Sequence, residues 1–310
     1  MTALTLYYAV KPLVPRRLQI MIRRSIAAHK RRSAKPVWPI DHRAGNAPPG
    51  WPGWPEQKRF ALVLNHDVDT AKGHDQCGFL SDMEKALGFR SAFFFVPEGY
   101  RVSKEQRCRL RDDGFEVGVH GLSHDGKMFS SRKVFEERAR RVNLYIKEWG
   151  ARGFSSPSMH RNLEWMADLD IEYGVSTFDT DPFEPQPEGI HRIFPFWYQD
   201  SPGRRGYVEI PYTLPQDHTL FVILREKNIQ IWKDKLDWII EKGGMALLNT
   251  HPDYMRFNGG KCSLEEYPAD MYADLLNHIK SRYAGQYWQP VAGDMARFWK
   301  ETKLQDKPPL

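Results

Sequence analysis

The apolar residues of this chain fall into short runs separated by longer stretches with helical periodicity. Phe60–Leu64 and Ala92–Val96 are two such runs of five residues, and FEVGVH and MALLNT contain two shorter stretches of the same kind. A short apolar run bounded by polar residues is typical of a strand that is buried on both faces, as strands of parallel sheets are. These runs therefore predict buried, parallel strands.

The stretches between these runs predict helices. The expected helices span residues 79–87, 104 onwards, 133–149, 229–240 and 267–283. Regular alternation of strand and helix over roughly 240 residues is typical of an α/β fold, and the strand spacing favours a closed or nearly closed (β/α) barrel. An open dinucleotide-binding sheet is disfavoured, because no glycine-rich phosphate-binding motif follows the first strand.

The chain before residue 57 differs in composition from the rest. Residues 1–40 contain nine Lys or Arg and no acidic residue, and residues 36–55 contain six Pro and three Gly. Proline and glycine at this density are typical of an extended connecting segment. We therefore expect three parts: a basic arm and linker over 1–56, a catalytic domain over 57–303 and a tail over 304–310.

The basic arm has the pattern of an amphipathic helix over residues 15–35. Its large apolar residues are expected on one side of that helix: Leu18, Met21, Ile22 and Ile26. Such a helix can bind an anionic membrane surface or dock a partner protein, and we expect residues 11–35 to contact the inner membrane; the alternative is a helix that packs on its own domain. We expect no nucleic-acid partner, because the positive charge is confined to one segment without a recognition motif.

Composition also bears on the location of the protein. The longest apolar runs have five residues, far fewer than the ~20 needed to cross a bilayer, and the first residues lack the features of a secretory signal. Cys77, Cys108 and Cys262 show no pairing pattern and are expected to be free thiols in a reducing compartment. We therefore expect a cytoplasmic protein, peripheral to the inner membrane through its basic arm.

Two carboxylates end the first predicted strand, in RFALVLNHDVDT. Side chains alternate along a strand, so Asp67 and Asp69 project to the same side, whereas His66 projects to the other side and is expected to be structural. Two carboxylates this close need a cation or a shared proton. Taken alone, such a pair more often caps a helix or lies in a solvated loop.

Histidines follow two other predicted strands. His120 and His124 are four residues apart, a spacing that on a helical turn places both imidazoles on one face, within reach of one metal ion. His251 ends the strand in MALLNTH. Both aspartates, His120 and His251 stand at the carboxyl ends of predicted parallel strands, and in a (β/α) barrel these ends share the face that carries the active site.

These residue types can be assigned chemical roles. Asp69, His120 and His124 would form a metal site of two histidines and one carboxylate that leaves positions open for water and substrate. Asp67 can act as general base, and His251 can protonate a leaving amine. The predicted reaction is hydrolysis of an amide or ester with a divalent metal; we expect Zn2+, although the same ligands accept cobalt or nickel.

Four motifs, HDVD, HGLSH, GFSSPS and LLNTH, resemble those of the polysaccharide deacetylase, or NodB-homology, family of carbohydrate esterases. The resemblance covers about residues 59–299, in both the order and the spacing of the motifs. It implies a distorted (β/α) barrel that binds zinc or a similar ion and removes acetyl groups from N-acetylated sugars. By motif, it assigns Asp67 as base, His251 as acid, and Asp69, His120 and His124 as metal ligands.

The sequence departs from this family at two positions. Ser155 stands where the family usually has an arginine that orients the base, and we expect Arg161 to replace that arginine. Gly174 stands where an aspartate is frequent. Asp217 is the candidate partner of His251, and its carboxylate would hold the imidazole in place.

The resemblance leaves the substrate open. We expect a carbohydrate or lipid-linked sugar that loses an acetyl or formyl group during assembly of exopolysaccharide or another cell-surface polysaccharide. One alternative is a glycosyltransferase, because a strand that ends in DxD can hold a metal against a nucleotide-sugar diphosphate. The other alternative is a catalytically degenerate barrel that binds carbohydrate without turnover, which Ser155 motivates.

Overall fold

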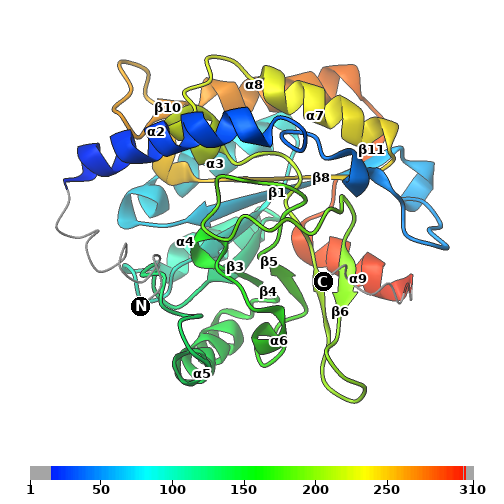
Figure 1. Cartoon of the computed structure of the whole chain (residues 1–310). Coiled ribbons are helices and arrows are strands. Elements are labelled where there is room, and N and C mark those ends of the chain that lie inside the picture. Colours follow the sequence, from blue (N-terminus) through cyan, green and yellow to red (C-terminus); the bar gives the residue numbers. More distant parts are fainter. Residues whose placement is uncertain (1–14, 303, 305–310) are drawn as a thin grey trace.

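A curled sheet enclosed by helices forms the body of the protein (Figure 1). The computed structural model describes residues 15–302 and residue 304. The first 14 residues of the expected arm, which include residues 11–14 of the expected membrane-contacting segment, lie outside the described residues. So do residue 303 and, from the expected tail, residues 305–310.

Most strands of the sheet run parallel. The strands are β1 (Phe60–Val68), β2 (Ala92–Phe95), β3 (Glu116–His120), β4 (Gly153–Ser155), β5 (Tyr173–Val175), β6 (Phe196–Tyr198), β7 (Tyr207–Glu209), β8 (Met245–Thr250) and β11 (Tyr287–Trp288). Their order is β11-β1-β2-β3-β4-β5-β7-β6, and β8 pairs with β1. Strands β6 and β7 pair antiparallel. A separate two-stranded ribbon consists of β9 (Met255–Arg256) and β10 (Tyr267–Pro268).

Two isolated bridges close the curled sheet where regular pairing is interrupted. Phe178 pairs with Tyr212, and Leu214 pairs with Leu248 of β8, both in parallel. Strand β8 in turn pairs with β1 from Ala61 to His66, so the ring of strands is complete. This arrangement confirms the α/β class and the distorted (β/α) barrel that the strand spacing predicts.

Helices surround this barrel, with α7 and α8 along the top of Figure 1 and α5 at the bottom. The helices are α2 (Arg16–Ala34), α3 (Ala71–Leu87), α4 (Lys104–Asp112), α5 (Arg132–Trp149), α6 (Leu163–Met166), α7 (Gln230–Glu241), α8 (Asp270–Arg282) and α9 (Ala292–Glu301). Shorter turns are η2 (His42–Gly45), η3 (Pro55–Gln57), η4 (Pro157–Met159), the π-helix η5 (His218–Ile223) and η6 (Pro252–Tyr254). The sequence predicted α3, α4, α5, α7 and α8, but not α9 or the short strands β4 and β6.

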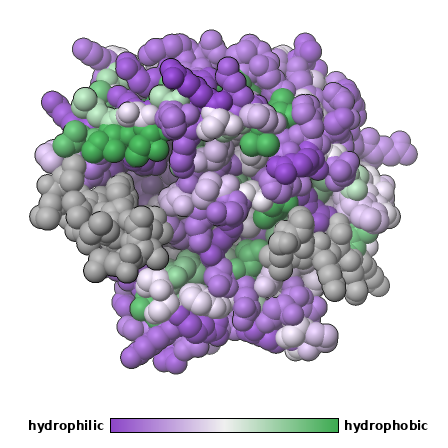
Figure 2. Space-filling view, in the orientation of Figure 1, coloured by the Kyte–Doolittle hydropathy of each residue, from purple (hydrophilic) through white to green (hydrophobic). Residues whose placement is uncertain are grey.

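Helix α2 is the amphipathic helix expected in the basic arm, and it packs on the barrel. Its buried residues are Ile20, Ala27 and Ala34, which recur every seven positions. The larger apolar residues stay exposed: Leu18, Met21, Ile22 and Ile26. Figure 2 shows apolar side chains gathered on the surface over this helix. Within residues 15–302, no helix is long and apolar enough to cross a membrane.

The Pro-rich segment after α2 is fixed to the barrel by aromatic side chains. Trp54 is buried, stacks on Phe194 and donates a hydrogen bond from Nε1 to the main-chain oxygen of Gly243 at 2.8 Å. Trp51 stacks on Trp299 of α9 at 5.1 Å between ring centroids. Because aromatic side chains bury large apolar areas, these contacts attach α2 and the linker firmly to the barrel.

Candidate metal centre and active site

The carboxyl ends of β1, β3 and β8 meet at one end of the barrel and carry the candidate residues. Asp67 and Asp69 stand at the end of β1 and project to the same side, as strand alternation predicts. His120 is the last residue of β3, and His251 directly follows β8. His66 projects away from them and lies between Thr250 and Glu84, at 2.7 and 2.9 Å, which fits the structural role expected for it.

His124 lies beside Asp69, but the backbone that brings it there differs from the expected helical turn. It lies in an irregular loop after β3, so the predicted helical turn between His120 and His124 was wrong. Gly121 reverses the chain there with a φ of 62°, and a Cβ at this position would lie 2.6 Å from Cγ of Pro157. Glycine is therefore required for the turn that brings the two imidazole rings to 5.5 Å between centroids.

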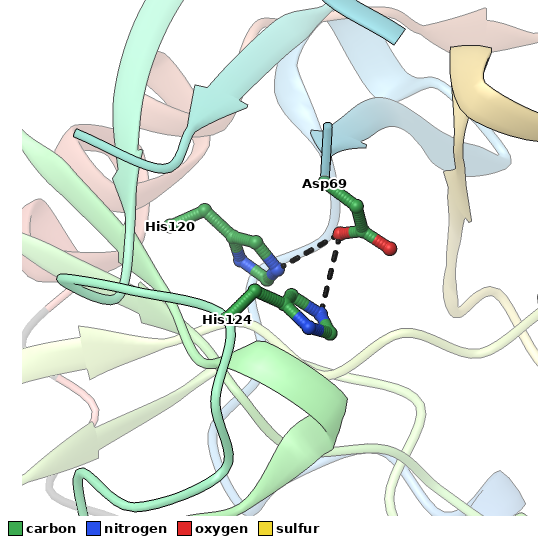
Figure 3. Close-up of side chains that lie close together, drawn as sticks. All are labelled: Asp69, His120 and His124. Carbon is green, nitrogen blue, oxygen red and sulfur yellow. Dashed lines mark ion pairs between the residues drawn. The ribbon is translucent and has the colours of Figure 1, made fainter. Parts of the chain in front are cut away.

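Asp69, His120 and His124 form a cluster of metal-ligand type (Figure 3). Oδ1 of Asp69 lies 3.3 Å from Nε2 of His120 and 3.4 Å from Nε2 of His124. Ligand atoms about 2.0–2.1 Å from a tetrahedral zinc ion are about 3.3 Å apart, so these separations fit such an ion. Oδ1 is also buried and has no hydrogen-bond partner among the described residues. The residues present therefore fit a divalent metal.

The contacts of His120 favour the tautomer in which Nε2 can bind a metal. Its Nδ1 lies 3.2 Å from the main-chain oxygen of Ser155, and donation of the Nδ1 proton leaves the lone pair of Nε2 directed toward Asp69. Burial lowers the pKa of His120, but the carboxylates of Asp67 and Asp69 raise it more strongly, so the net pKa is raised. Electrostatically, this position is built for a positive charge, which a bound cation supplies in place of the proton.

Asp67 is a buried carboxylate held by an asparagine. Nδ2 of Asn249 donates a hydrogen bond to Oδ2 of Asp67 at 2.7 Å, and Nδ1 of His120 lies 3.4 Å from Oδ1. Sequence reasoning missed Asn249, although a signal was present. Asn249 precedes His251 by two residues in LLNTH, so strand alternation places both on the same face.

Arg161 does not replace the family arginine beside Asp67, so this prediction was wrong. Its guanidinium donates hydrogen bonds to the main-chain oxygens of Met159 and Glu188 and lies 4.9 Å from the ring of Phe178. These contacts fix the loop after β4. The partner of Asp67 is instead the side-chain amide of Asn249 on β8.

The two departures from the family pattern have different structural consequences. Ser155 is buried at the end of β4, and its Oγ has no hydrogen-bond partner among the described residues. At Gly174, a Cβ would lie 2.2 Å from Oε2 of Glu209, so the carboxyl of Glu209 fills the space of a side chain. Burial raises the pKa of Glu209 to about 7. A carboxyl group from β7 thus occupies the region where the family often has an aspartate on β5.

His251 and Asp217 form the pair suggested by the sequence. Nδ1 of His251 lies 2.7 Å from Oδ1 of Asp217, and the main-chain N–H of His251 donates to Oδ2 at 2.9 Å. The hydroxyl of Tyr267 also donates to Oδ2 at 2.9 Å. Burial lowers the pKa of His251, but the carboxylates of Asp217, Asp69 and Asp67 together outweigh this effect, and the net pKa is raised to about 10. His251 is therefore held protonated, as a general acid requires.

Tyr254, His218 and Asp253 complete the site and were not predicted. The hydroxyl of Tyr254 donates to Oδ2 of Asp69 at 3.4 Å, and its ring lies 4.7 Å from that of His218. Asp253 accepts a hydrogen bond from the main-chain N–H of Asp69 at 3.0 Å and so fixes the end of β1. All three come from segments without a recognisable motif, η5 and η6.

A cavity of about 1370 Å3 opens over these residues. Its floor contains the candidate metal ligands, Asp67 and His251. Helix α2 forms part of the opposite wall, although it lies far from the barrel residues in sequence. The space is large enough for a sugar with substituents, because pockets for drug-sized ligands measure roughly 300–1,000 Å3.

Solved structures with the same architecture are polysaccharide deacetylases and an allantoinase. A protein from Mycobacterium smegmatis described as a polysaccharide deacetylase is 15% identical, with a TM-score of 0.64 over 86% of this chain and 100% of its own. PuuE allantoinase is 16% identical, with a TM-score of 0.60 over 86% of this chain and 98% of its own.

A protein from Pseudomonas aeruginosa PAO1, also described as a polysaccharide deacetylase, is 16% identical, with a TM-score of 0.61 over 82% of this chain and 95% of its own. No protein-family profile matches the sequence, and no curated protein does. Identities this low carry information on architecture. The chain therefore has the distorted (β/α) barrel fold of the polysaccharide deacetylases.

Proposed function

We propose that the chain is a metal-dependent hydrolase that removes an acetyl or formyl group from the nitrogen of an amino sugar. One observation carries the proposal: a metal-ligand cluster, a buried carboxylate base and a protonated histidine converge on the floor of one cavity. The shared fold with proteins described as polysaccharide deacetylases supports it.

The residues of the site divide the work of amide hydrolysis. A divalent ion held by Asp69, His120 and His124 would supply Lewis acidity to the acyl carbonyl and make water in the site more acidic. Asp67, oriented by Asn249, accepts a proton from the attacking water. His251, kept protonated by Asp217, delivers a proton to the departing amine nitrogen.

Metal content and acyl release test this proposal directly. The protein is assayed for acetate and formate release from N-acetyl and N-formyl amino sugars, beside Asp67→Asn and Asp69→Ala. We expect one metal per chain in the wild type and in Asp67→Asn, loss of release in Asp67→Asn, and loss of metal in Asp69→Ala.

Two other outcomes favour the alternatives. Bound metal without release from any acylated sugar supports a carbohydrate-binding barrel, the more so if Ser155→Arg restores release. Binding of a nucleotide sugar without release supports a DxD glycosyltransferase, an assignment that leaves His120, His124 and His251 without a role.

We also propose that the substrate is a precursor of a cell-surface polysaccharide, carried on a lipid at the inner membrane. The exposed apolar residues of α2, together with its basic residues, support contact with an anionic membrane. Deletion of residues 1–35 would also remove a wall of the cavity, so substitutions are the sharper test. We expect Leu18→Gln with Met21→Gln to abolish co-sedimentation with phosphatidylglycerol vesicles; unchanged sedimentation would contradict membrane contact.

A further inference from the structure

Helix α2 presents basic side chains to the cavity, in addition to the charged residues of the candidate metal centre. Arg16, Arg23 and Lys30 all line it, and they are spaced seven residues apart. Seven residues make nearly two turns of an α-helix, so the three side chains form one stripe, called here the basic stripe. The sequence alone does not show that this stripe faces a catalytic cavity.

The orientation of α2 on the barrel is firmly determined. Ala27 packs on Val222 and Ile223 of the π-helix η5. Nε of Arg24 donates to the main-chain oxygen of Val222 at 3.0 Å, and Nη2 donates to that of Leu264 at 2.8 Å. Because the adjacent face is fixed in this way, the basic stripe is held toward the cavity.

The members of the basic stripe differ in their contacts. Arg16 forms an ion pair with Glu265 at 2.6 Å, and Nζ of Lys30 donates to the main-chain oxygen of Pro182 at 2.8 Å. The guanidinium of Arg23 has no hydrogen bond or ion pair to any other residue within 15–302. It is half-buried in the cavity wall and offers five N–H donors to whatever occupies the cavity.

An acidic residue opposite the stripe does not cancel its charge at neutral pH. Burial and the neighbouring Asp181 raise the pKa of Glu184 to about 7, and the charge of Arg23 opposes this rise. Oε1 of Glu184 accepts hydrogen bonds from Gln216 at 3.3 Å and Tyr212 at 3.4 Å. Glu184 is therefore partly protonated near pH 7 and offsets the charge of Arg23 only in part.

Arg23 lies near the metal centre but outside it. Its charge acts on His218 and Tyr254, and the hydroxyl of Tyr254 in turn donates to Oδ2 of Asp69. Arg23 thus lines the same cavity as the metal ligands without belonging to their cluster. A group bound by Arg23 belongs to a part of the substrate other than the reacting acyl group.

We propose that Arg23, supported by Lys30, binds an anionic group of the substrate, a phosphate or a carboxylate, while the acyl group lies at the metal centre. The inference rests on the proposed deacylase function and adds a substrate class, an acylated amino sugar with a negative charge elsewhere on the molecule. Guanidinium and ammonium groups recognise both anions, and arginine binds them through two parallel hydrogen bonds.

The experiment compares Arg23→Gln with Arg17→Gln, a matched control on the exposed side of the same helix. The probes are N-acetylglucosamine, N-acetylglucosamine 1-phosphate and N-acetylglucosaminuronic acid. We expect Arg23→Gln to lower kcat/KM for a charged probe by about 10- to 100-fold and to leave the neutral probe unchanged, because hydrogen bonds between charged groups have this strength. Arg17→Gln should resemble the wild type, and the probe with the larger loss identifies the anion.

Calorimetry tests anion binding by Arg23 independently of the proposed deacylase activity. Binding of the same probes is measured to Asp67→Asn protein with and without Arg23→Gln. Charged probes that bind through Arg23 without acyl release from the wild type would sustain the anion site and refute the deacylase. Three results would refute the anion site. These are an unchanged kcat/KM in Arg23→Gln for the charged probes, an equal loss of kcat/KM for charged and neutral probes, and no binding of the charged probes.

Discussion

The hydrogen bond from Asn249 to Asp67 yields the sharpest prediction, because it replaces the arginine expected beside the base. Asn249→Leu keeps the approximate shape of the side chain and removes the donor. Oδ1 of Asn249 has no hydrogen-bond partner among the described residues, so within them the substitution breaks one side-chain hydrogen bond, the 2.7 Å contact to Oδ2 of Asp67.

The magnitude follows from the type of contact. A hydrogen bond to a charged group contributes about 1.5–3 kcal/mol, and about 1.4 kcal/mol corresponds to a factor of ten in rate. If Asn249 orients the base for proton transfer, kcat/KM for acyl release should fall about 10- to 100-fold in Asn249→Leu. Metal content should stay at the wild-type value, because Asn249 lies outside the ligand cluster.

The assay is the pH profile of kcat/KM, with thermal unfolding as control. Asn249→Asp places a second carboxyl beside Asp67, so the pair should hold a proton and the acidic limb of the profile should move to higher pH. A purely structural role would change unfolding without moving this limb. Full activity in Asn249→Leu with an unshifted limb in Asn249→Asp would refute the assignment.

Three further predictions concern charge and metal. Asp217→Asn removes the largest of the carboxylate effects that together raise the pKa of His251 to about 10, so the alkaline limb of the activity profile should move to lower pH; an unmoved limb would exclude His251 as the acid. Glu209 has its pKa raised from 4.5 to about 7 by burial, so the unfolded chain releases this proton first, and stability falls by on the order of 3 kcal/mol between pH 4.5 and 7. Glu209→Gln should abolish that fall, measured as Tm at pH 5 and pH 8, and an equal fall in both proteins would contradict the burial argument. Chelation should abolish acyl release and lower Tm, since a metal that binds the folded site stabilises it, and added Zn2+ should restore both; an unchanged Tm would argue against the Asp69 site.

The sequence was sufficient to predict the floor of the cavity because strand geometry is local and regular. Alternation along β1 places Asp67 and Asp69 on one side, and parallel strands bring their ends to His120 and His251. Strand β4 has three residues, too few to show a period. The loop that carries His124 depends on the turn at Gly121, where Pro157 leaves no room for a Cβ. The spacing of residues in the sequence does not reveal such a turn.

The position of α2 was beyond sequence reasoning for a different reason. The hydrophobic pattern favours burial of the side with Leu18 and Met21, yet the structure buries the side with Ile20 and Ala27. The small side chain of Ala27 lets α2 approach η5 closely, and Arg24, one turn away, donates to the main-chain oxygens of Val222 and Leu264. Such docking depends on the shape of a surface formed by residues far away in the sequence. The same holds for Arg161, which contacts main-chain oxygens of Met159 and Glu188 and not Asp67.

The contacts of α2 also have a consequence for the order in which the protein matures. The two main-chain oxygens that accept from Arg24 lie 198 and 240 residues further along the chain. At 5–20 residues per second, a ribosome needs roughly 12–48 s to synthesise 240 residues. Helix α2 must therefore wait until Leu264, in the last quarter of the barrel, has emerged before all of its contacts can form, and the substrate cavity is among the last features of the nascent protein to be completed.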